Sequence, residues 1–201
     1  MIRCCFIRHG MTFGNTQKRY IGTTDEPLCE DGVKDIQEKI EQGYYPRADF
    51  LFVSPLLRCR QTAELIYPEQ EQQIAPGFAE TDFGLFENKN YEELKEEPAY
   101  QAFLDSMGKT PFPGGESSEQ VAQRVCRQME EIVSSLPEEG TAVFVVHGGT
   151  IMHLLARYGK PEKDFYHWQT GNGEGYLGVF SPKEWGKNPE ITEICPLKKK
   201  Q

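Results

Sequence analysis

The stretch Ile2-Arg3-Cys4-Cys5-Phe6-Ile7-Arg8-His9-Gly10 decides the fold of this 201-residue chain. Residues 2–7 have the composition and length of a buried strand, and Gly10 interrupts the pattern. His9 therefore emerges at the carboxyl end of a first strand, with Arg8 beside it. In open α/β sheets, ligands bind in the crevice outside the carboxyl ends of the strands. A neighbouring cation disfavours protonation of an imidazole, so we expect a neutral His9 near pH 7.

Apolar runs alternate with segments of helical period along the chain, which predicts βα units and a largely parallel sheet. Ser54 resembles an N-cap with Pro55 at the first helical position, and Ser117 resembles the cap of the longest helix. We predict an α/β fold, a three-layer α/β/α sandwich around a mostly parallel sheet, in a single domain over residues 1–201. The expected strands are 2–7, 50–53, 141–146, 176–180 and 190–194, and the expected helices are 33–43, 55–66, 91–107 (short helices), 117–136 and 148–158.

Charge and composition restrict the class of partner. The net charge of −9 and the pI of about 5.1 argue against nucleic acid or an anionic membrane surface as the main partner. A small anionic molecule remains open, because local arginines outweigh distant acids at contact range. We therefore expect a small-molecule substrate, no nucleic acid and no membrane, with a homodimer left open.

The six cysteines form no CxxC pair and no spacing typical of zinc ligands. We expect reduced thiols in a cytoplasmic protein, with Cys4 and Cys5 pointing to opposite faces of their strand. The start of the sequence has no basic segment followed by an apolar core, so no signal peptide is expected. The end of the sequence, 198–201, is expected to be a solvated tail. No metal and no cofactor are implied.

Four short sequence blocks lie along the chain from the end of the first strand onward. They are Arg8-His9-Gly10 with Thr12 and Asn15, then Ser54-Pro55-Leu56-Leu57-Arg58, then Glu80 ahead of Phe83-Gly84, then Val145-Val146-His147-Gly148-Gly149. Together, over roughly residues 2–158, they resemble the histidine phosphatase superfamily, also called the phosphoglycerate-mutase-like family. The resemblance implies a phosphoglycerate-mutase-like fold and phosphoryl transfer through a phosphohistidine.

The residues themselves are suited to that chemistry. Carboxyl ends of parallel strands share one edge, so His9, the turn after Ser54 and His147 should meet there. Helix N-termini at that edge, including the one at Gly148, favour an anion. A neutral histidine can attack phosphorus, while arginines and an amide stabilise the oxygens and a carboxylic acid protonates the leaving group. A second histidine supplies another donor if the bound phosphate protonates it. The candidates for these roles are His9 (nucleophile), Arg8 and Arg58 (cations), Asn15 and His147 (donors) and Glu80 (acid). The resemblance implies the same roles, and adds a substrate contact at Gly22.

Several other readings stay open from the residues alone. A lone Arg58 is more often a solvated helix residue, and Glu87 rivals Glu80 as the acid. His153 is better explained as a boundary histidine, and His167 as packing on Trp168. Gly108-Lys109-Thr110 fails as a phosphate-binding loop, because Phe103 occupies the position of the first glycine.

Three activities fit the resemblance: phosphomonoester hydrolysis, phosphoglycerate mutation, and phosphate binding by an inactive relative. All expected catalytic residues are present, which disfavours the inactive relative. Family mutases carry Ser or Thr where this chain has Ile21, which removes a donor for a substrate carboxylate. We therefore favour a phosphatase. Residues 83–87 and 113–117 most resemble the α-ribazole phosphatase branch, although Asn88 stands where that branch usually has glycine.

Overall fold

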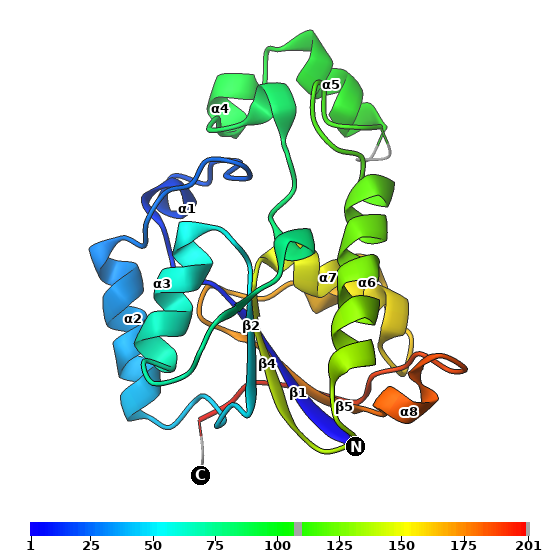
Figure 1. The fold of residues 1–201 in the computed structure, drawn as a ribbon. Coiled ribbons are helices and arrows are strands. Elements are labelled where there is room, and N and C mark those ends of the chain that lie inside the picture. The colour runs from blue at the N-terminus through cyan, green and yellow to red at the C-terminus, as the bar shows by residue number, and fades with distance from the viewer. Residues whose placement is uncertain (107–109, 200–201) are drawn as a thin grey trace.

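A six-stranded sheet forms the centre of the protein, whose computed structural model describes residues 1–106 and 110–199 (Figure 1). The strand order is β3-β2-β4-β1-β5-β6. The pairs β1·β4, β2·β4 and β2·β3 are parallel, and the pairs β1·β5 and β5·β6 are antiparallel. The predicted mostly parallel α/β fold is confirmed. The strands are β1 (Ile2–Arg8), β2 (Phe50–Val53), β3 (Gln73–Ile74), β4 (Gly140–Val146), β5 (Gly175–Phe180) and β6 (Thr192–Pro196).

Helices cover both faces of this sheet. Figure 1 shows α2 and α3 on one side and α6 and α7 on the other. This arrangement gives the three layers that the alternating sequence pattern predicts. The helices are α1 (Phe13–Thr16), α2 (Glu30–Glu41), α3 (Leu57–Ile66), α4 (Tyr91–Leu94), α5 (Pro98–Asp105), α6 (Ser118–Ser135), α7 (Gly148–Tyr158) and α8 (Pro182–Trp185).

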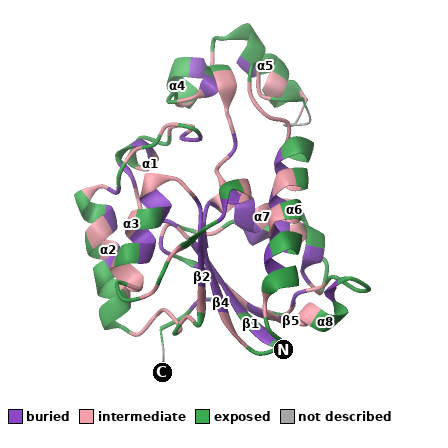
Figure 2. Cartoon of the chain, in the orientation of Figure 1, coloured by how far each residue is buried: buried purple, intermediate pink, exposed green. Residues whose placement is uncertain are grey.

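The alternation of β1 side chains builds two separate cores. Cys4 and Phe6 belong to the apolar cluster beneath α6 and α7, whereas Cys5 and Ile7 belong to the cluster beneath α3. Phe6 stacks on Phe144 with ring centroids 4.9 Å apart. Because both faces are covered, the central strands are buried along most of their length (Figure 2).

The start of α3 differs from the prediction. Ser54 does not cap this helix, which begins at Leu57 after the N-cap Leu56. The Ser54 hydroxyl instead lies 2.7 Å from Nε2 of His147, and Asp25 accepts the Leu57 N–H at 2.6 Å. A carboxylate from a distant loop thus caps α3, and the serine serves the neighbouring strand end. The final strand is also displaced, since β6 spans Thr192–Pro196 where 190–194 was predicted, and the short β3 was not predicted.

Helices α4 and α5 stand apart from the sheet, above its carboxyl edge (Figure 1). They share a small aromatic core centred on the buried Phe86, Leu94 and Tyr100. They account for the short helices predicted over 91–107, except that residue 107 lies outside the described residues. So do residues 108 and 109 of the rejected phosphate-loop motif and residues 200 and 201 of the predicted tail.

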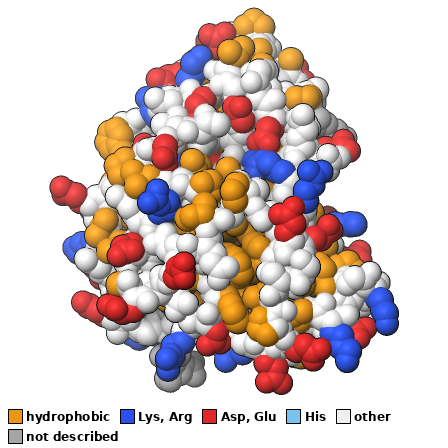
Figure 3. All heavy atoms as spheres, in the orientation of Figure 1, with side chains coloured by type: hydrophobic (Ala, Val, Ile, Leu, Met, Phe, Trp, Pro, Cys, Tyr) orange, Lys and Arg blue, Asp and Glu red, His pale blue; other side chains and the backbone are white. Residues whose placement is uncertain are grey.

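The surface carries both signs of charge. Acidic and basic side chains are interspersed over the face shown in Figure 3. Among residues 1–106 and 110–199, no helix is long and apolar enough to cross a membrane.

Candidate active site

The carboxyl edge of the parallel strands brings the distant sequence blocks together. His9 follows β1 and His147 follows β4, and their ring centroids lie 5.2 Å apart. Ser54, at the end of β2, contacts His147 directly. A Cβ atom added to Gly148, the first residue of α7, would lie 3.5 Å from Nε of Arg8. The predicted meeting of these blocks at one edge is therefore observed.

One ring nitrogen of His9 is hydrogen-bonded within the protein, and the bond fixes the orientation of the ring. Its side chain is buried, and Nδ1 donates to the carbonyl oxygen of Gly10 at 2.7 Å. The Gly10 N–H is in turn fixed by the Thr62 hydroxyl on α3, at 2.9 Å. Burial holds the pKa of His9 well below 6.5, and the charges of Arg58 and Arg8 lower it further. The imidazole is therefore neutral, with the proton on Nδ1 and the lone pair on Nε2.

Two arginines flank this imidazole, and backbone carbonyls clamp both of them. Arg58 is fully buried, and its terminal nitrogens donate to the carbonyls of Ile21, Gly22 and Thr24 at 2.9–3.2 Å. Arg8 donates through Nη1 to the carbonyl of Thr170 at 2.7 Å. Each guanidinium also carries a buried Nε that has no acceptor among the described residues. An anion between them would meet rigid, partly unpaired donors.

Of the two rival acids, Glu80 is the one that lies near a histidine of the site, His147. Its Oε1 accepts the Thr81 N–H at 2.8 Å, and its Oε2 lies 3.9 Å from Nδ1 of His147. Burial raises the pKa of Glu80, and the Thr81 N–H and the two arginines offset part of that rise. Glu87 points elsewhere, because its Oε1 accepts the N–H groups of Gly22 and Thr24, both at 2.8 Å.

Two of the predicted substrate contacts have partners within the protein. Asn15 accepts the Thr12 N–H through Oδ1 at 3.2 Å, which caps α1. Gly22 donates its N–H to Glu87, and its carbonyl accepts from Arg58. A Cβ at Gly22 would lie 2.0 Å from the Thr81 carbonyl oxygen, so this glycine permits a close approach of two loops.

Two further residues support the site and were missed in the sequence. Asn172 donates through Nδ2 to the His9 carbonyl at 3.0 Å and to Asn15 Oδ1 at 3.2 Å. Arg124, on α6, donates to the Glu80 carbonyl at 3.0 Å and pairs with Glu116 at 2.7 Å. The only sequence signal for Asn172 is its place in the turn Gly171-Asn172-Gly173, and Arg124 has none beyond its spacing from Glu116.

An aromatic cavity of about 320 Å³ opens beside Glu80. His153 also lines it, where it packs on Phe165 at 4.7 Å between ring centroids, and burial lowers the pKa of His153 to about 4. Among the described residues that line the cavity there is no lysine or arginine. Its aromatic walls come from the loops and helices above the sheet edge and include Tyr20, Phe83, Phe103, Phe112, Phe165 and Tyr166.

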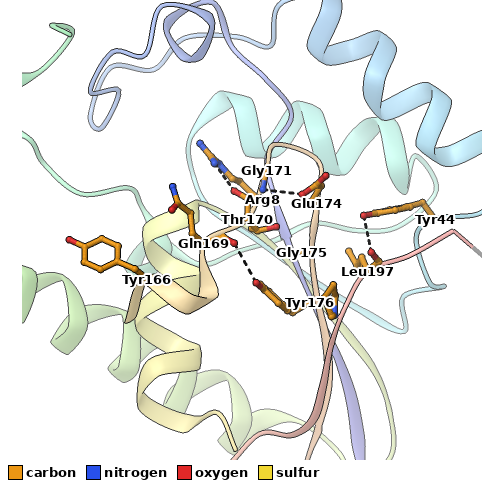
Figure 4. A pocket seen from close by; sticks show the side chains of 11 residues that line it. Arg8, Tyr44, Tyr166, Gln169, Thr170, Gly171, Glu174, Gly175, Tyr176 and Leu197 are labelled. Atoms are coloured by element: carbon orange, nitrogen blue, oxygen red, sulfur yellow. Dashed lines mark hydrogen bonds between the residues drawn. The ribbon is translucent and has the colours of Figure 1, made fainter. Parts of the chain in front are cut away.

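Arg8 and Tyr166 also line a second cavity, of about 730 Å³, shown in Figure 4. Its wall is more polar and includes Glu174 and Gln169. The bond from Arg8 to the Thr170 carbonyl crosses this region, so the 170–174 turn fixes the arginine from that side.

The family of the chain follows from comparison with known proteins. A sequence model of the histidine phosphatase superfamily (branch 1) matches residues 4–187. The chain belongs to that superfamily. The chain is 30% identical over 160 residues to the Erwinia tasmaniensis protein named "Probable phosphoglycerate mutase GpmB", an alignment that covers 78% of this chain and 74% of that one. It is 29% identical over 166 residues to the Bacillus subtilis "Uncharacterized phosphatase PhoE", covering 81% of each chain.

A solved structure agrees with this assignment. The crystal structure of the α-ribazole phosphatase from Shigella flexneri is 26% identical in sequence and superimposes with a TM-score of 0.76, covering 89% of this chain and 91% of that chain. Membership makes the protein a phosphatase or a phosphoglycerate mutase, with a substrate of the phosphomonoester type. Within the described part of the chain, no group of three or more His, Cys, Asp or Glu side chains is placed to hold a metal ion.

Proposed function

We propose that this histidine phosphatase is a phosphomonoester hydrolase that acts through a phosphohistidine on a small phosphorylated metabolite, with α-ribazole 5′-phosphate as the candidate substrate. The observation that carries the proposal is His9, whose Nδ1 is bonded to the Gly10 carbonyl and whose ring feels the charges of Arg58 and Arg8, with the half-buried acid Glu80 beside the neighbouring His147. Transfer of a phosphoryl group to a histidine nitrogen requires a lone pair on that nitrogen, positive charge around the phosphoryl oxygens and a proton donor for the leaving group.

In the first step, Nε2 of His9 attacks phosphorus and the bond from phosphorus to the leaving oxygen breaks. Glu80 gives its proton to that oxygen, so the alcohol leaves neutral. In the second step, a water attacks the phosphohistidine while Glu80, now a carboxylate, accepts the water proton. The N–P bond breaks, inorganic phosphate leaves, and His9 and Glu80 return to their starting states.

The phosphoryl oxygens meet fixed donors throughout both steps. Arg8 and Arg58 supply the cationic N–H groups, and their clamping by carbonyls means that little reorganisation accompanies the reaction. Asn15, His147 and the backbone N–H of Gly148 at the start of α7 add uncharged donors. Because two cations and a helix N-terminus supply the positive potential, the proposal includes no metal and no cofactor.

The aromatic cavity supports a ring-bearing leaving group. It adjoins Glu80, where the leaving oxygen must lie, and its walls offer faces for stacking. The low pKa of His153 keeps that side chain uncharged at neutral pH. The benzimidazole of α-ribazole suits such a cavity, which agrees with the name of the Shigella relative.

Phosphoglycerate mutase is the alternative, and it is the activity named for the Erwinia relative. A phosphoglycerate carries a carboxylate, which needs a cation or a hydroxyl donor near the phosphate. Ile21 offers no hydroxyl, and the described lining of the cavity offers no lysine or arginine. These features favour hydrolysis of a phosphomonoester that carries no carboxylate.

A substrate panel tests the proposal. We expect phosphate release from α-ribazole 5′-phosphate and from aryl-bearing monoesters to exceed isomerisation of 3-phosphoglycerate, with or without bisphosphoglycerate priming. Phe165→Ala should lower kcat/KM for ring-bearing substrates selectively, while Ile74→Ala, which changes an exposed side chain on β3, should not. Efficient priming-dependent isomerisation with little phosphate release contradicts the proposal.

A further inference from the structure

The two buried histidines of the site use different ring nitrogens for their bonds within the protein. His9 has Nδ1 bonded to the Gly10 carbonyl, at 2.7 Å. His147 has Nε2 bonded to the Ser54 hydroxyl, also at 2.7 Å, while its Nδ1 lies toward Glu80 at 3.9 Å. Each ring therefore has one nitrogen in a short bond to a fixed partner. The other nitrogen of His147 lies 3.9 Å from Glu80 and has only a weak contact with Cys59 Sγ, at 3.8 Å.

A neutral imidazole has one N–H to place. His147 is fully buried, and burial together with the charges of Arg58 and Arg8 holds its pKa well below 6.5. His147 is therefore uncharged, and it can donate a hydrogen bond to a phosphate only through the one N–H of its neutral ring. With the proton on Nε2, Nδ1 would present a lone pair to phosphoryl oxygens and to the Glu80 carboxylate. With the proton on Nδ1, the same ring becomes a donor to them.

The surroundings of Ser54 decide between these tautomers. Ser54 is buried at the end of β2, fixed by a bond from its N–H to the Val145 carbonyl at 3.0 Å. Its Oγ receives the Leu56 N–H at 3.4 Å, so that neighbour offers no acceptor for the hydroxyl proton. Cys59 Sγ, which lies 3.5 Å from the same Nε2, is a weak acceptor and has the Val146 carbonyl as its own partner. The imidazole Nε2 is thus the best acceptor that the hydroxyl can reach.

We propose that Ser54 is a positioning residue whose hydroxyl donates to Nε2 of His147 and so holds that ring in its Nδ1–H tautomer, with the N–H directed at the phosphoryl group. The inference rests on the proposed function, since it assigns the donor a phosphoryl oxygen. It makes the two histidines complementary. The Gly10 carbonyl leaves His9 with a lone pair for attack, and the Ser54 hydroxyl leaves His147 with a proton for stabilisation.

The tautomer can be measured directly in the wild-type protein. In protein labelled with ¹⁵N-histidine, two-bond proton–nitrogen spectra report which ring nitrogen carries the proton, and the His147 signal is assigned by its loss in His147→Gln. We expect a neutral His147 protonated on Nδ1 near pH 7. A proton on Nε2 overturns the inference without any need for a Ser54 variant.

Substitutions then test the role of the hydroxyl. Ser54→Ala should move the proton of His147 toward Nε2, lower kcat/KM by about 10²-fold, as loss of an oxyanion donor does, and weaken inhibition by inorganic phosphate. Ser54→Thr keeps a hydroxyl and should restore the Nδ1–H signal and most of the activity. Cys59→Ala is the matched control, because it removes the weaker sulfur contacts with the same ring, at 3.5 and 3.8 Å, and leaves the Ser54 hydroxyl in place.

The outcomes separate this inference from the proposed function. Turnover in Ser54→Ala that matches the wild type, or an unchanged tautomer, overturns the role of Ser54 while leaving the phosphatase intact. A wild-type protein that releases phosphate from no monoester refutes the proposed function, and the wild-type tautomer still decides the Ser54–His147 bond.

Discussion

Replacing Glu80 by glutamine should separate proton donation from phosphoryl binding. The change is isosteric, and the side-chain oxygen can still accept the Thr81 N–H, which Oε1 accepts at 2.8 Å. The Arg124 bond to the Glu80 carbonyl is a backbone contact and is also retained. The fold should therefore persist, and the loss should be limited to an acidic proton and, in the second step, a base.

The magnitude follows from the position of the carboxyl group. General acid–base assistance is worth about 10²–10⁴-fold when donor and acceptor are well placed. Oε2 of Glu80 lies 3.9 Å from Nδ1 of His147 and has no hydrogen bond among the described residues, and burial raises the pKa of the group. We therefore expect kcat/KM for an alkyl monoester to fall by about 10³-fold, or about 4 kcal/mol in activation free energy.

The assay compares leaving groups. Nitrophenolate departs without a proton, so kcat/KM for p-nitrophenyl phosphate in Glu80→Gln should fall by less than about 10-fold. The second step still lacks its base, so nitrophenolate should appear in a burst and the phosphohistidine should accumulate.

Glu87→Gln is the matched control for this experiment. Glu87 lies close by, but its Oε1 accepts the N–H groups of Gly22 and Thr24, and glutamine retains such an oxygen. Its two kcat/KM values should keep their wild-type ratio. Equal losses for both substrates in Glu80→Gln, or an alkyl-selective loss in Glu87→Gln, would refute the reasoning and move the acid role to Glu87.

Three other perturbations have definite expectations. Arg58→Ala should lower kcat/KM for alkyl and aryl substrates alike, by about 10²-fold or more, because it removes stabilisation of the phosphoryl group itself; a loss confined to one substrate counts against that role. Incubation with EDTA should leave activity intact, and recovery only upon adding a divalent ion would show a metal requirement. The free energy of unfolding should fall as the pH drops from 6.5 toward 4, because the folded pKa of His153 is about 4 and only the unfolded chain takes up its proton in that window. Denaturant titrations at several pH values should show a shallower fall for His153→Phe, and an equal fall would assign the effect to other groups.

Much of the fold could be predicted because the central strands are buried on both faces. Residues 2–7, 50–53 and 141–146 are nearly uninterrupted apolar runs, as parallel strands require, and their bounds were correct to within one residue. The late strand near 190–194 alternates polar residues at an edge, and its position was off by two residues. Local patterns thus located what is buried more accurately than what lies at the rim.

Tertiary partners explain what the sequence could not reveal. Ser54 followed by Pro55 is a sound local cap signal, but the hydroxyl contacts His147, which is 93 positions away. Arg58 can be buried because backbone carbonyls accept its hydrogen bonds. Every residue has a carbonyl, so the sequence does not show which ones will lie near Arg58. The same holds for Arg124, whose partners include the carbonyls of Gly77, Ala79 and Glu80. Side chains that bind backbone are the part of a site that residue types do not encode.

Trapping the covalent intermediate tests the central claim most directly. Glu80→Gln protein mixed briefly with p-nitrophenyl phosphate, then quenched in alkali, should gain one phosphoryl group that is stable to base, labile to acid and located by mass spectrometry on the peptide containing His9. The double variant with His9→Ala should gain none and should have lost turnover by about 10⁴-fold or more. A phosphoryl group on any other residue, or one that still forms in the double variant that lacks His9, would contradict the account.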